Sequence, residues 1–176
     1  MSLPKILISL VLIFPLSPSL VAQSSATGKP SSFQCVPCGY DCDKTTYDHP
    51  GKCPHCQMDL VDVRTITFKT IAPEDICAYV KKHPDVLLLD VRTQQEFEGK
   101  ADPDFGTLKY AVNVPVQELE ARLSSLSAWK VKDIIVYCSH SHRSPRAAWI
   151  LSNNGFKKVT NMAGGLSVLK DRSCVK

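Results

Sequence analysis

The 176-residue sequence has little net charge, no long apolar run and no internal repeat. Its formal net charge of +4 at pH 7 is too small to indicate nucleic acid or a membrane surface as a partner. No segment reaches the roughly 20 apolar residues of a spanning helix, so no stable membrane span is expected. The lack of repeats excludes a solenoid. The length suits one ordinary domain plus a small extra piece, since domains commonly run to about 100–200 residues.

Residues 1–22 have the pattern of a secretory signal peptide. Lys5 precedes a short apolar stretch, and small and polar residues up to Ala22 form a candidate cleavage site. The alternative is an uncleaved membrane anchor, but Pro15 and the shortness of the apolar stretch argue against a spanning helix. We therefore expect an exported protein, in the periplasm or outside the cell. Residues 23–33 follow with the Ser, Gly and Pro content of a flexible linker.

Residues 34–62 are rich in cysteine. The pairs Cys35 with Cys38 and Cys53 with Cys56 have zinc-ribbon spacing, because each Cys-x-x-Cys turn presents two thiolates to one tetrahedral ion. A segment this short cannot bury a useful core, so it needs a metal or disulfides to hold a shape. We expect a closed, structural zinc site on these four cysteines. Disulfides are the alternative in an oxidising compartment.

The stretch Tyr-Asp-His-Pro-Gly-Lys-Cys-Pro-His-Cys-Gln-Met-Asp-Leu at 47–60 is similar to the small heavy-metal-binding module of exported bacterial metal-handling proteins. That module usually opens with Cys-Pro-Met-His-Pro and closes with Cys-Gly-Met, whereas here Gln57 replaces the glycine. The resemblance leaves open a second alternative, an open site that delivers or senses a heavy metal. Cys42, His49 and His55 are surplus to a four-thiolate site, and we expect them beside the ligands or unengaged.

Residues 133–155 predict a strand, a loop and a helix around one cysteine. The first residues are β-branched and aromatic, as in a strand buried on both faces, and an Asn-Gly pair marks the helix end. Cys138 directly follows the strand. A helix beginning near Ser144 would direct free N–H groups and its positive dipole end at the thiol, and Arg143 and Arg146 add charge. This setting predicts a reactive thiolate, with a buried structural cysteine as the alternative.

The loop Cys-Ser-His-Ser-His-Arg-Ser that begins at Cys138 resembles the active-site loop of the rhodanese family, whose single-domain members have a strand, a cysteine, four residues and arginine-serine. Three further segments resemble family motifs in the same order. They are Leu-Leu-Leu-Asp-Val-Arg followed by Glu-Phe at 87–97, Ala-Val-Asn-Val-Pro at 111–115, and Asn-Met-Ala-Gly-Gly-Leu at 161–166. Four ordered motifs are a much stronger signal than any one alone.

The resemblance implies a rhodanese-like α/β domain at 63–172, with an open parallel sheet and helices on both faces. The alternating pattern of the sequence agrees, and it places the site at the carboxyl ends of the strands, where Cys138 falls. Cys77 is expected in the core and Cys174 as an unengaged thiol in a tail. We expect strands at 63–68, 86–91, 111–114 and 134–137, and helices at 73–82, 116–126 and 144–154.

The resemblance also implies ping-pong transfer of a sulfane sulfur through a persulfide on Cys138, without a cofactor. A small anionic donor such as thiosulfate supplies the sulfur, and a thiol, a cyanide-like molecule or a protein accepts it. Loop N–H groups and the helix dipole stabilise the persulfide, the arginines hold the donor, and the histidines add charge or trade a proton. Asp90 and Arg92 brace the loop or form a plain salt bridge. The expected substrate-contacting residues are Ser139, His140, Ser141, His142, Arg143, Ser144, Arg146, Asp90 and Arg92.

The sequence departs from the rhodanese pattern at three places. Ser141 stands where a glycine is common, Thr107 and Tyr110 replace a histidine and a glycine, and residues 168–169 replace a closing tryptophan. If position 141 requires a positive φ, the serine strains the loop by about 1 kcal/mol or more. Two alternatives to an enzyme remain. Ser141 is the basis for a weakly active rhodanese fold that recognises a partner, and the N-terminal cysteines are the basis for a metal-handling protein. A phosphatase or arsenate reductase is disfavoured because their loops usually have one more residue between cysteine and arginine.

Overall fold

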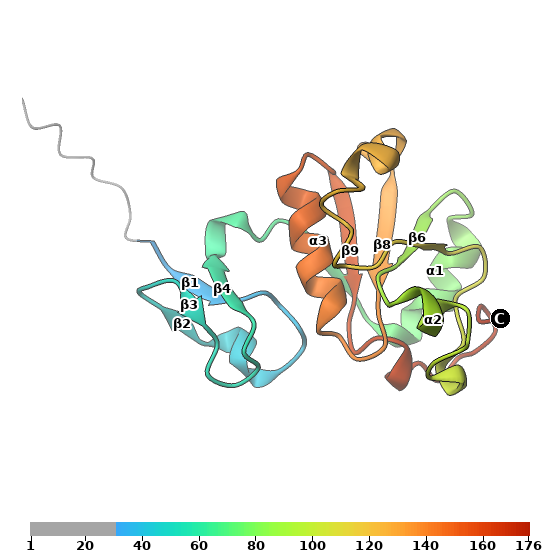
Figure 1. Cartoon of the computed structure of the whole chain (residues 1–176), viewed down its shortest axis with the longest axis horizontal. Coiled ribbons are helices and arrows are strands. Elements are labelled where there is room, and N and C mark those ends of the chain that lie inside the picture. Colours follow the sequence, from blue (N-terminus) through green and yellow to red (C-terminus); the bar gives the residue numbers. More distant parts are fainter. Residues whose placement is uncertain (1–30) are drawn as a thin grey trace, which may run out of the picture.

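A computed structural model describes residues 31–176, so the expected signal peptide at 1–22 and most of the linker at 23–33 lie outside the described residues. The chain forms a small antiparallel module and a larger α/β domain. Figure 1 shows the module beside the helix α3 (Arg143–Asn153) of the larger domain. Within residues 31–176, no helix is long and apolar enough to cross a membrane.

The module is a four-stranded antiparallel sheet with strand order β2-β1-β4-β3. Its interior is a cluster of cysteines around Leu60, with Phe33, Tyr47 and Met58 at the edge. Strands of two to four residues bury little apolar surface, so the cysteines take the place of an ordinary core. The strands are β1 (Phe33–Cys35), β2 (Thr46–Tyr47), β3 (Gly51–Lys52) and β4 (Asp59–Asp62).

The larger domain contains a five-stranded sheet whose strand pairings are all parallel, in the order β5-β9-β8-β6-β7. Its central strands at 87–90 and 133–137 are buried on both faces, whereas the edge strands are more exposed. Leu87 and Leu89 pack into one hydrophobic cluster and Leu88 into the other, as the two-residue period of a strand requires. The strands are β5 (Lys69–Ile71), β6 (Leu87–Asp90), β7 (Val112–Asn113), β8 (Asp133–Tyr137) and β9 (Lys158–Met162).

Helices cover both faces of this sheet, which confirms the expected architecture. On one face, buried residues of α3 and of the 3-10 helix η5 (Leu123–Trp129) join the first cluster. On the other face, α1 (Ile76–Lys82) contributes Ile76 to the second cluster. The α-helix α2 (Gln94–Phe97) is a single turn that follows β6, and short 3-10 turns lie at η3 (Pro73–Asp75), η4 (Pro103–Phe105) and η6 (Leu166–Val168).

The strand expected at 63–68 is wrong. The chain forms the 3-10 turn η2 (Val63–Thr65) there, and the strand β5 begins only at Lys69. The cause is local, because the carboxylate of Asp62 accepts hydrogen bonds from both the backbone and the side chain of Arg64. This turn ends the module sheet and redirects the chain toward the larger domain.

The helix expected at 116–126 is also wrong. The segment forms turns followed by η5, and most of its amides bond three residues back, as in Leu119 N to Val116 O and Ser125 N to Arg122 O. Leucines at spacings of three and four suit a tight 3-10 run as well as an α-helix. Leu119 and Leu126 are still buried, so the apolar pattern predicted the buried face but not the type of helix.

Cys77 is buried, as expected, but it is not a free thiol. The expectation of an unengaged Cys174 is wrong, because the two cysteines form a disulfide across 97 residues. The C-terminal segment lies along residues 107–109, where Lys109 N donates to Cys174 O (2.8 Å) and Lys176 N to Thr107 O (2.8 Å). The tail is therefore fixed to α1 and to the edge of the domain. Nothing in the local sequence around either cysteine indicates this pairing.

Candidate active site and metal centre

Cys138 lies at the carboxyl end of β8, the central strand of the parallel sheet. The residue is 1% exposed, and its Sγ lies 3.4 Å from Ser144 Oγ in the first turn of α3. Two hydrogen bonds from the loop after β9 fix the backbone: Leu166 N donates to Cys138 O (2.9 Å) and Ser167 N to Ser139 O (3.0 Å). The strand thus delivers the thiol to the start of the helix, as the sequence predicts.

The loop between Cys138 and α3 is a cradle of hydrogen-bond donors. Within residues 31–176, the amides at 139–142 donate no hydrogen bond, and α3 begins directly after them. Free N–H groups and the positive end of an 11-residue helix stabilise an anion held between them. Gly165 makes room behind the loop, since a Cβ there would clash with the carbonyl of Ser139.

Ser141 adopts the left-handed conformation with φ of +64°, which confirms that this position requires a positive φ. The residue is 2% exposed and its Oγ is buried without a hydrogen-bond partner in the described chain. The serine therefore carries two costs that a glycine would avoid, a strained backbone and a desolvated hydroxyl.

Arg143 forms a bidentate ion pair with Glu96 of α2. Its Nη1 lies 2.6 Å from Glu96 Oε2 and its Nη2 lies 2.7 Å from Oε1, and Nη2 also donates to Ser139 Oγ (2.7 Å). Arg143 lowers the pKa of the Glu96 carboxyl to about 2. We expected Arg143 to hold the donor, but its guanidinium is committed to bracing the loop. Glu96 is a site residue that sequence reasoning missed.

Asp90 and Arg92 form an ion pair with no exposed side-chain area. Arg92 reaches the carboxylate with Nε at 3.0 Å and Nη2 at 2.7 Å, and Nη2 also donates to Gly106 O and Thr107 Oγ1. In the described chain, no hydrogen bond of these two side chains reaches residues 139–144. The pair therefore fixes the segment at 106–107, and the expectation that it contacts substrate has no support from this geometry.

The other predicted site residues lie at the border between the loop and the module. His140 meets the edge of Phe105, with ring centroids 5.1 Å apart, and His142 meets Tyr40 of the module at 5.4 Å. Arg146 is exposed, and its Nη1 lies 3.5 Å from Asp59 Oδ2 of β4.

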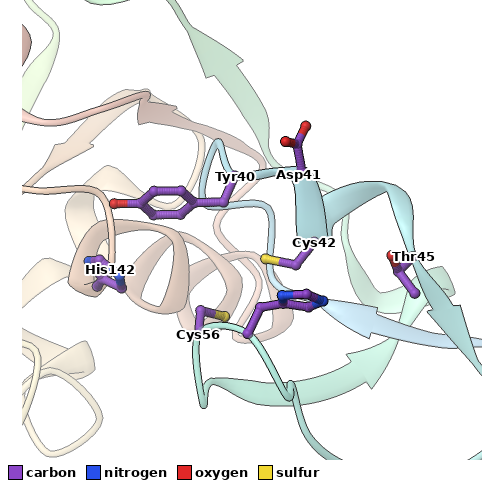
Figure 2. A pocket seen from close by; sticks show the side chains of 7 residues that line it. Tyr40, Asp41, Cys42, Thr45, Cys56 and His142 are labelled. Carbon is purple, nitrogen blue, oxygen red and sulfur yellow. The ribbon is translucent and has the colours of Figure 1, made fainter.

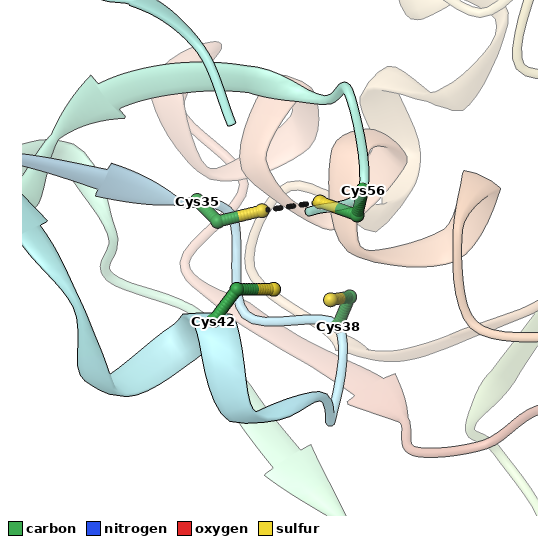
Figure 3. Close-up of side chains that lie close together, drawn as sticks. All are labelled: Cys35, Cys38, Cys42 and Cys56. Carbon is green, nitrogen blue, oxygen red and sulfur yellow. Dashed lines mark hydrogen bonds between the residues drawn. The ribbon is translucent and has the colours of Figure 1, made fainter. Parts of the chain in front are cut away.

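The sulfur atoms of four module cysteines lie within 4.8 Å of one another, as Figure 3 shows. Three of them, Cys35, Cys38 and Cys56, belong to the predicted zinc set. The fourth is Cys42 rather than the predicted Cys53, because the 3-10 turn η1 (Asp41–Lys44) directs Cys42 into the module. The spacing of the Cys-x-x-Cys pairs gave no information about this turn.

This donor set suits a soft metal ion. Four thiol groups whose sulfur atoms lie within 4.8 Å of one another form the kind of ligand set that zinc and other thiophilic ions prefer. Burial raises the pKa of the Cys38 thiol to about 12 and that of Cys42 to about 11, so without a cation both hold protons that a bound ion replaces. Burial acts in the same direction on Cys53, but the N–H groups of Cys56 and His55 outweigh it and lower the Cys53 pKa to about 7. Cys53 is the adjacent fifth thiol.

A cavity of about 440 Å³ lies between the cysteine cluster and the Cys138 loop. Figure 2 shows Tyr40, Cys42 and Cys56 on the module side and His142 on the loop side. His55, which we expected beside the ligands or unengaged, also lines this cavity together with Cys42 and Cys56. The cysteine cluster and the Cys138 loop are neighbours in the folded chain.

Two family profiles match the chain. The Rhodanese-like domain profile matches residues 74–172, and the Heavy metal binding domain profile matches residues 41–63. The first match covers the parallel sheet from α1 onward with the Cys138 loop. The second begins at η1 and includes Cys42, Cys53 and Cys56.

Individual relatives agree with the first match. The chain is 35% identical over 97 residues to the uncharacterized protein YqhL of Bacillus subtilis, covering 55% of this chain and 68% of that protein. It is 33% identical over 82 residues to a protein of Allochromatium vinosum named sulfurtransferase, covering 47% of this chain and 69% of the other. A rhodanese-like domain protein from Staphylococcus aureus has the same fold, with a TM-score of 0.50, 23% identity, and coverage of 62% of this chain and 99% of that one.

Proposed function

Because the chain belongs to the rhodanese family, we propose that it is an enzyme that transfers a sulfane sulfur through a persulfide on Cys138. The observation that carries the proposal is the placement of this thiol, at the end of the central strand and before four loop amides that donate no hydrogen bond in the described chain. Family membership and the relative named sulfurtransferase support sulfur transfer in general. The donor and acceptor below are our own inference from the chemistry of the loop.

The donor that suits this loop is thiosulfate or a similar small anion. The Cys138 thiolate attacks the outer sulfur, the sulfur–sulfur bond of the donor breaks, and sulfite leaves with the electron pair. The amides at 139–142 and the start of α3 stabilise the persulfide anion that remains. Arg143 acts mainly by holding the loop through Glu96 and Ser139, and the exposed Arg146 attracts the donor. A thiol, cyanide or a protein thiol then removes the sulfur.

The metal centre has a structural role in this proposal. Zinc bound to Cys35, Cys38, Cys42 and Cys56 would hold together a module that has almost no apolar core. Nothing in the proposed chemistry of Cys138 requires the ion.

Handling of a heavy metal is the second candidate function, favoured by the match at 41–63 and by the half-buried position of Cys56 beside a cavity. An ion that binds stoichiometrically and does not exchange with added metal would argue for the structural role. Rapid exchange would favour metal handling.

We also propose that the protein acts outside the cytoplasm. The first 22 residues support this with the pattern of a signal peptide. The Cys77–Cys174 disulfide adds support, because disulfides persist mainly in oxidising compartments. Fractionation of cells expressing the full chain tests the location, and N-terminal sequencing of the mature protein tests cleavage after Ala22.

The substitution Cys138→Ser tests the transfer reaction. The change is nearly isosteric but removes the thiolate, so we expect the protein to fold and to lose sulfur transfer from thiosulfate to cyanide. Mass spectrometry of the wild-type protein with thiosulfate should show one added sulfur, localised to Cys138. Cys53→Ser removes a different free cysteine and controls for general thiol chemistry. Activity that survives Cys138→Ser would move the chemistry to another residue.

A further inference from the structure

Tyr40 of the module lies between two cavities that border the catalytic loop. It lines the cavity of about 440 Å³ shared with His142, and it also lines a second cavity of about 360 Å³ whose wall includes His140 and Ser141. Its ring lies 5.4 Å from that of His142 (Figure 2). The side chain is 51% exposed, so it contributes a wall to both spaces and little to the core of the module.

The turn that carries Tyr40 is fixed at both ends by the cysteine cluster. Cys38, two residues before Tyr40, and Cys42, two residues after it, each contribute a sulfur to the four-thiol group. Within the turn, the carboxylate of Asp43 accepts hydrogen bonds from Cys38 N (3.0 Å) and Gly39 N (2.7 Å), and Asp43 N donates to Tyr40 O (3.0 Å). The position of the ring beside the loop is therefore set by the module and not by the rhodanese-like domain.

We propose that Tyr40 is a specificity-determining residue that limits the size of the acceptor that takes sulfur from Cys138; this inference rests on the proposed sulfur transfer. Tyr40 lines both cavities, one of which is bordered by His140 and the other by His142. A small acceptor fits on either side. A larger thiol that approaches the loop meets the ring, and loss of the ring would give it more room.

The transfer step is the same for every acceptor, so access alone distinguishes them. The acceptor nucleophile attacks the outer sulfur of the persulfide, the sulfur–sulfur bond to Cys138 breaks, and the electron pair returns to Cys138 as a thiolate. The acceptor leaves with the sulfur, as thiocyanate from cyanide or as a persulfide from a thiol. No oxidant or reductant is consumed.

The substitution Tyr40→Ala tests this assignment in the full-length protein. Cyanide serves as the small acceptor and glutathione as the large one, and kcat/KM is measured for each after loading with thiosulfate. We expect the glutathione-to-cyanide ratio to rise about tenfold, a change within the range that pocket size gives in other enzymes. The rate of persulfide formation on Cys138 should not change, because thiosulfate is small. A merely structural role of Tyr40 would alter both half-reactions together.

Two further variants control the test. Tyr40→Phe keeps the ring and should keep the wild-type ratio. Tyr110→Ala removes a ring that is 93% exposed and borders neither cavity, and it should leave the ratio unchanged. A ratio that stays constant or falls in Tyr40→Ala, while Cys138 still loads sulfur, overturns the inference and leaves the proposed function intact. Failure of the wild-type protein to load sulfur overturns the proposed function itself.

Discussion

Glu96 connects the catalytic loop to the helix that follows the neighbouring strand. Thr93 and Glu96 form a capping box, in which Thr93 Oγ1 accepts from Glu96 N and Glu96 Oε2 accepts from Thr93 N (2.9 Å). The same carboxylate binds Arg143, 47 residues further along the chain. A Thr-x-x-Glu pattern was present in the sequence as a signal for the cap. The link to Arg143 could not be predicted from it, because that contact depends on the pairing of β6 with β8.

Glu96→Gln should lower the free energy of unfolding at pH 7 by about 3 kcal/mol, because Arg143 lowers the carboxyl pKa from 4.5 to about 2 and each unit corresponds to about 1.4 kcal/mol. The folded-state pKa lies below the unfolded one, so this stability is present above about pH 4.5 and is lost as the pH falls toward 2. Urea unfolding of both proteins at pH 7 and pH 3 measures it. Glu118→Gln, at an exposed ion pair, controls for the loss of a charge. Equal stabilities at pH 7 would contradict the prediction.

Ser141→Gly should stabilise the protein, because it removes both a strained φ and a buried hydroxyl without a partner in the described chain. We expect a gain of about 1–2 kcal/mol in the free energy of unfolding, read from the denaturant midpoint. Tyr110→Gly is the matched control, since Tyr110 has nearly the same φ of +65° but an exposed side chain. It should gain less, because only backbone strain is removed. Destabilisation by Ser141→Gly would mean that the hydroxyl has a partner in the working enzyme.

At the scale of elements, the sequence predicted best where a single local signal decides the structure. The strand β8, the loop after it and α3 were placed within one or two residues, because an apolar run, a basic helix start and an Asn-Gly stop all lie within the segment. Predictions failed where two structures share a pattern, as for the leucines before and within η5. They also failed where distant segments decide the result. Cys42 enters the sulfur cluster through a short 3-10 turn, and no spacing rule distinguishes it from Cys53.

The Cys77–Cys174 disulfide should contribute about 4 kcal/mol to stability, since it closes a loop of about 100 residues in the unfolded chain. We expect the double substitution Cys77→Ser with Cys174→Ser to lower the free energy of unfolding by that amount. Reductant should lower the stability of the wild-type protein to the same level and leave the double variant unchanged. A reductant effect of equal size in both proteins would place the sensitive bond elsewhere.

At the scale of the whole molecule, the two parts of the chain meet at the site. The module contributes Tyr40, Cys42, His55 and Cys56 to a cavity that reaches His142, and Trp149 Nε1 of α3 donates to Thr65 Oγ1 of the connecting turn (2.9 Å). Sequence alone separated a metal module from a catalytic domain and gave no reason for contact between them. The folded chain adds that the module shapes the approach to the loop, while the sheet and both hydrophobic clusters of the catalytic domain lie outside it.

The two parts should therefore be separable in folding and in the first half-reaction. A fragment beginning at Val63 retains the sheet, the loop and the Glu96 brace, so we expect it to fold and to form the persulfide, with or without a chelator. A fragment of residues 31–62 should become ordered only with a metal bound or with its cysteines oxidised, since its interior is mainly thiols. Circular dichroism, metal content and free-thiol counts measure these outcomes. If the first fragment folds but does not load sulfur, or if a chelator prevents loading in the full-length protein, the metal module contributes a group to the chemistry of Cys138.

In the fragment of residues 31–62, Cys42→Ser should weaken metal binding by more than about tenfold and by more than Cys53→Ser does. The reason is that Cys42 belongs to the group of four sulfurs and Cys53 does not.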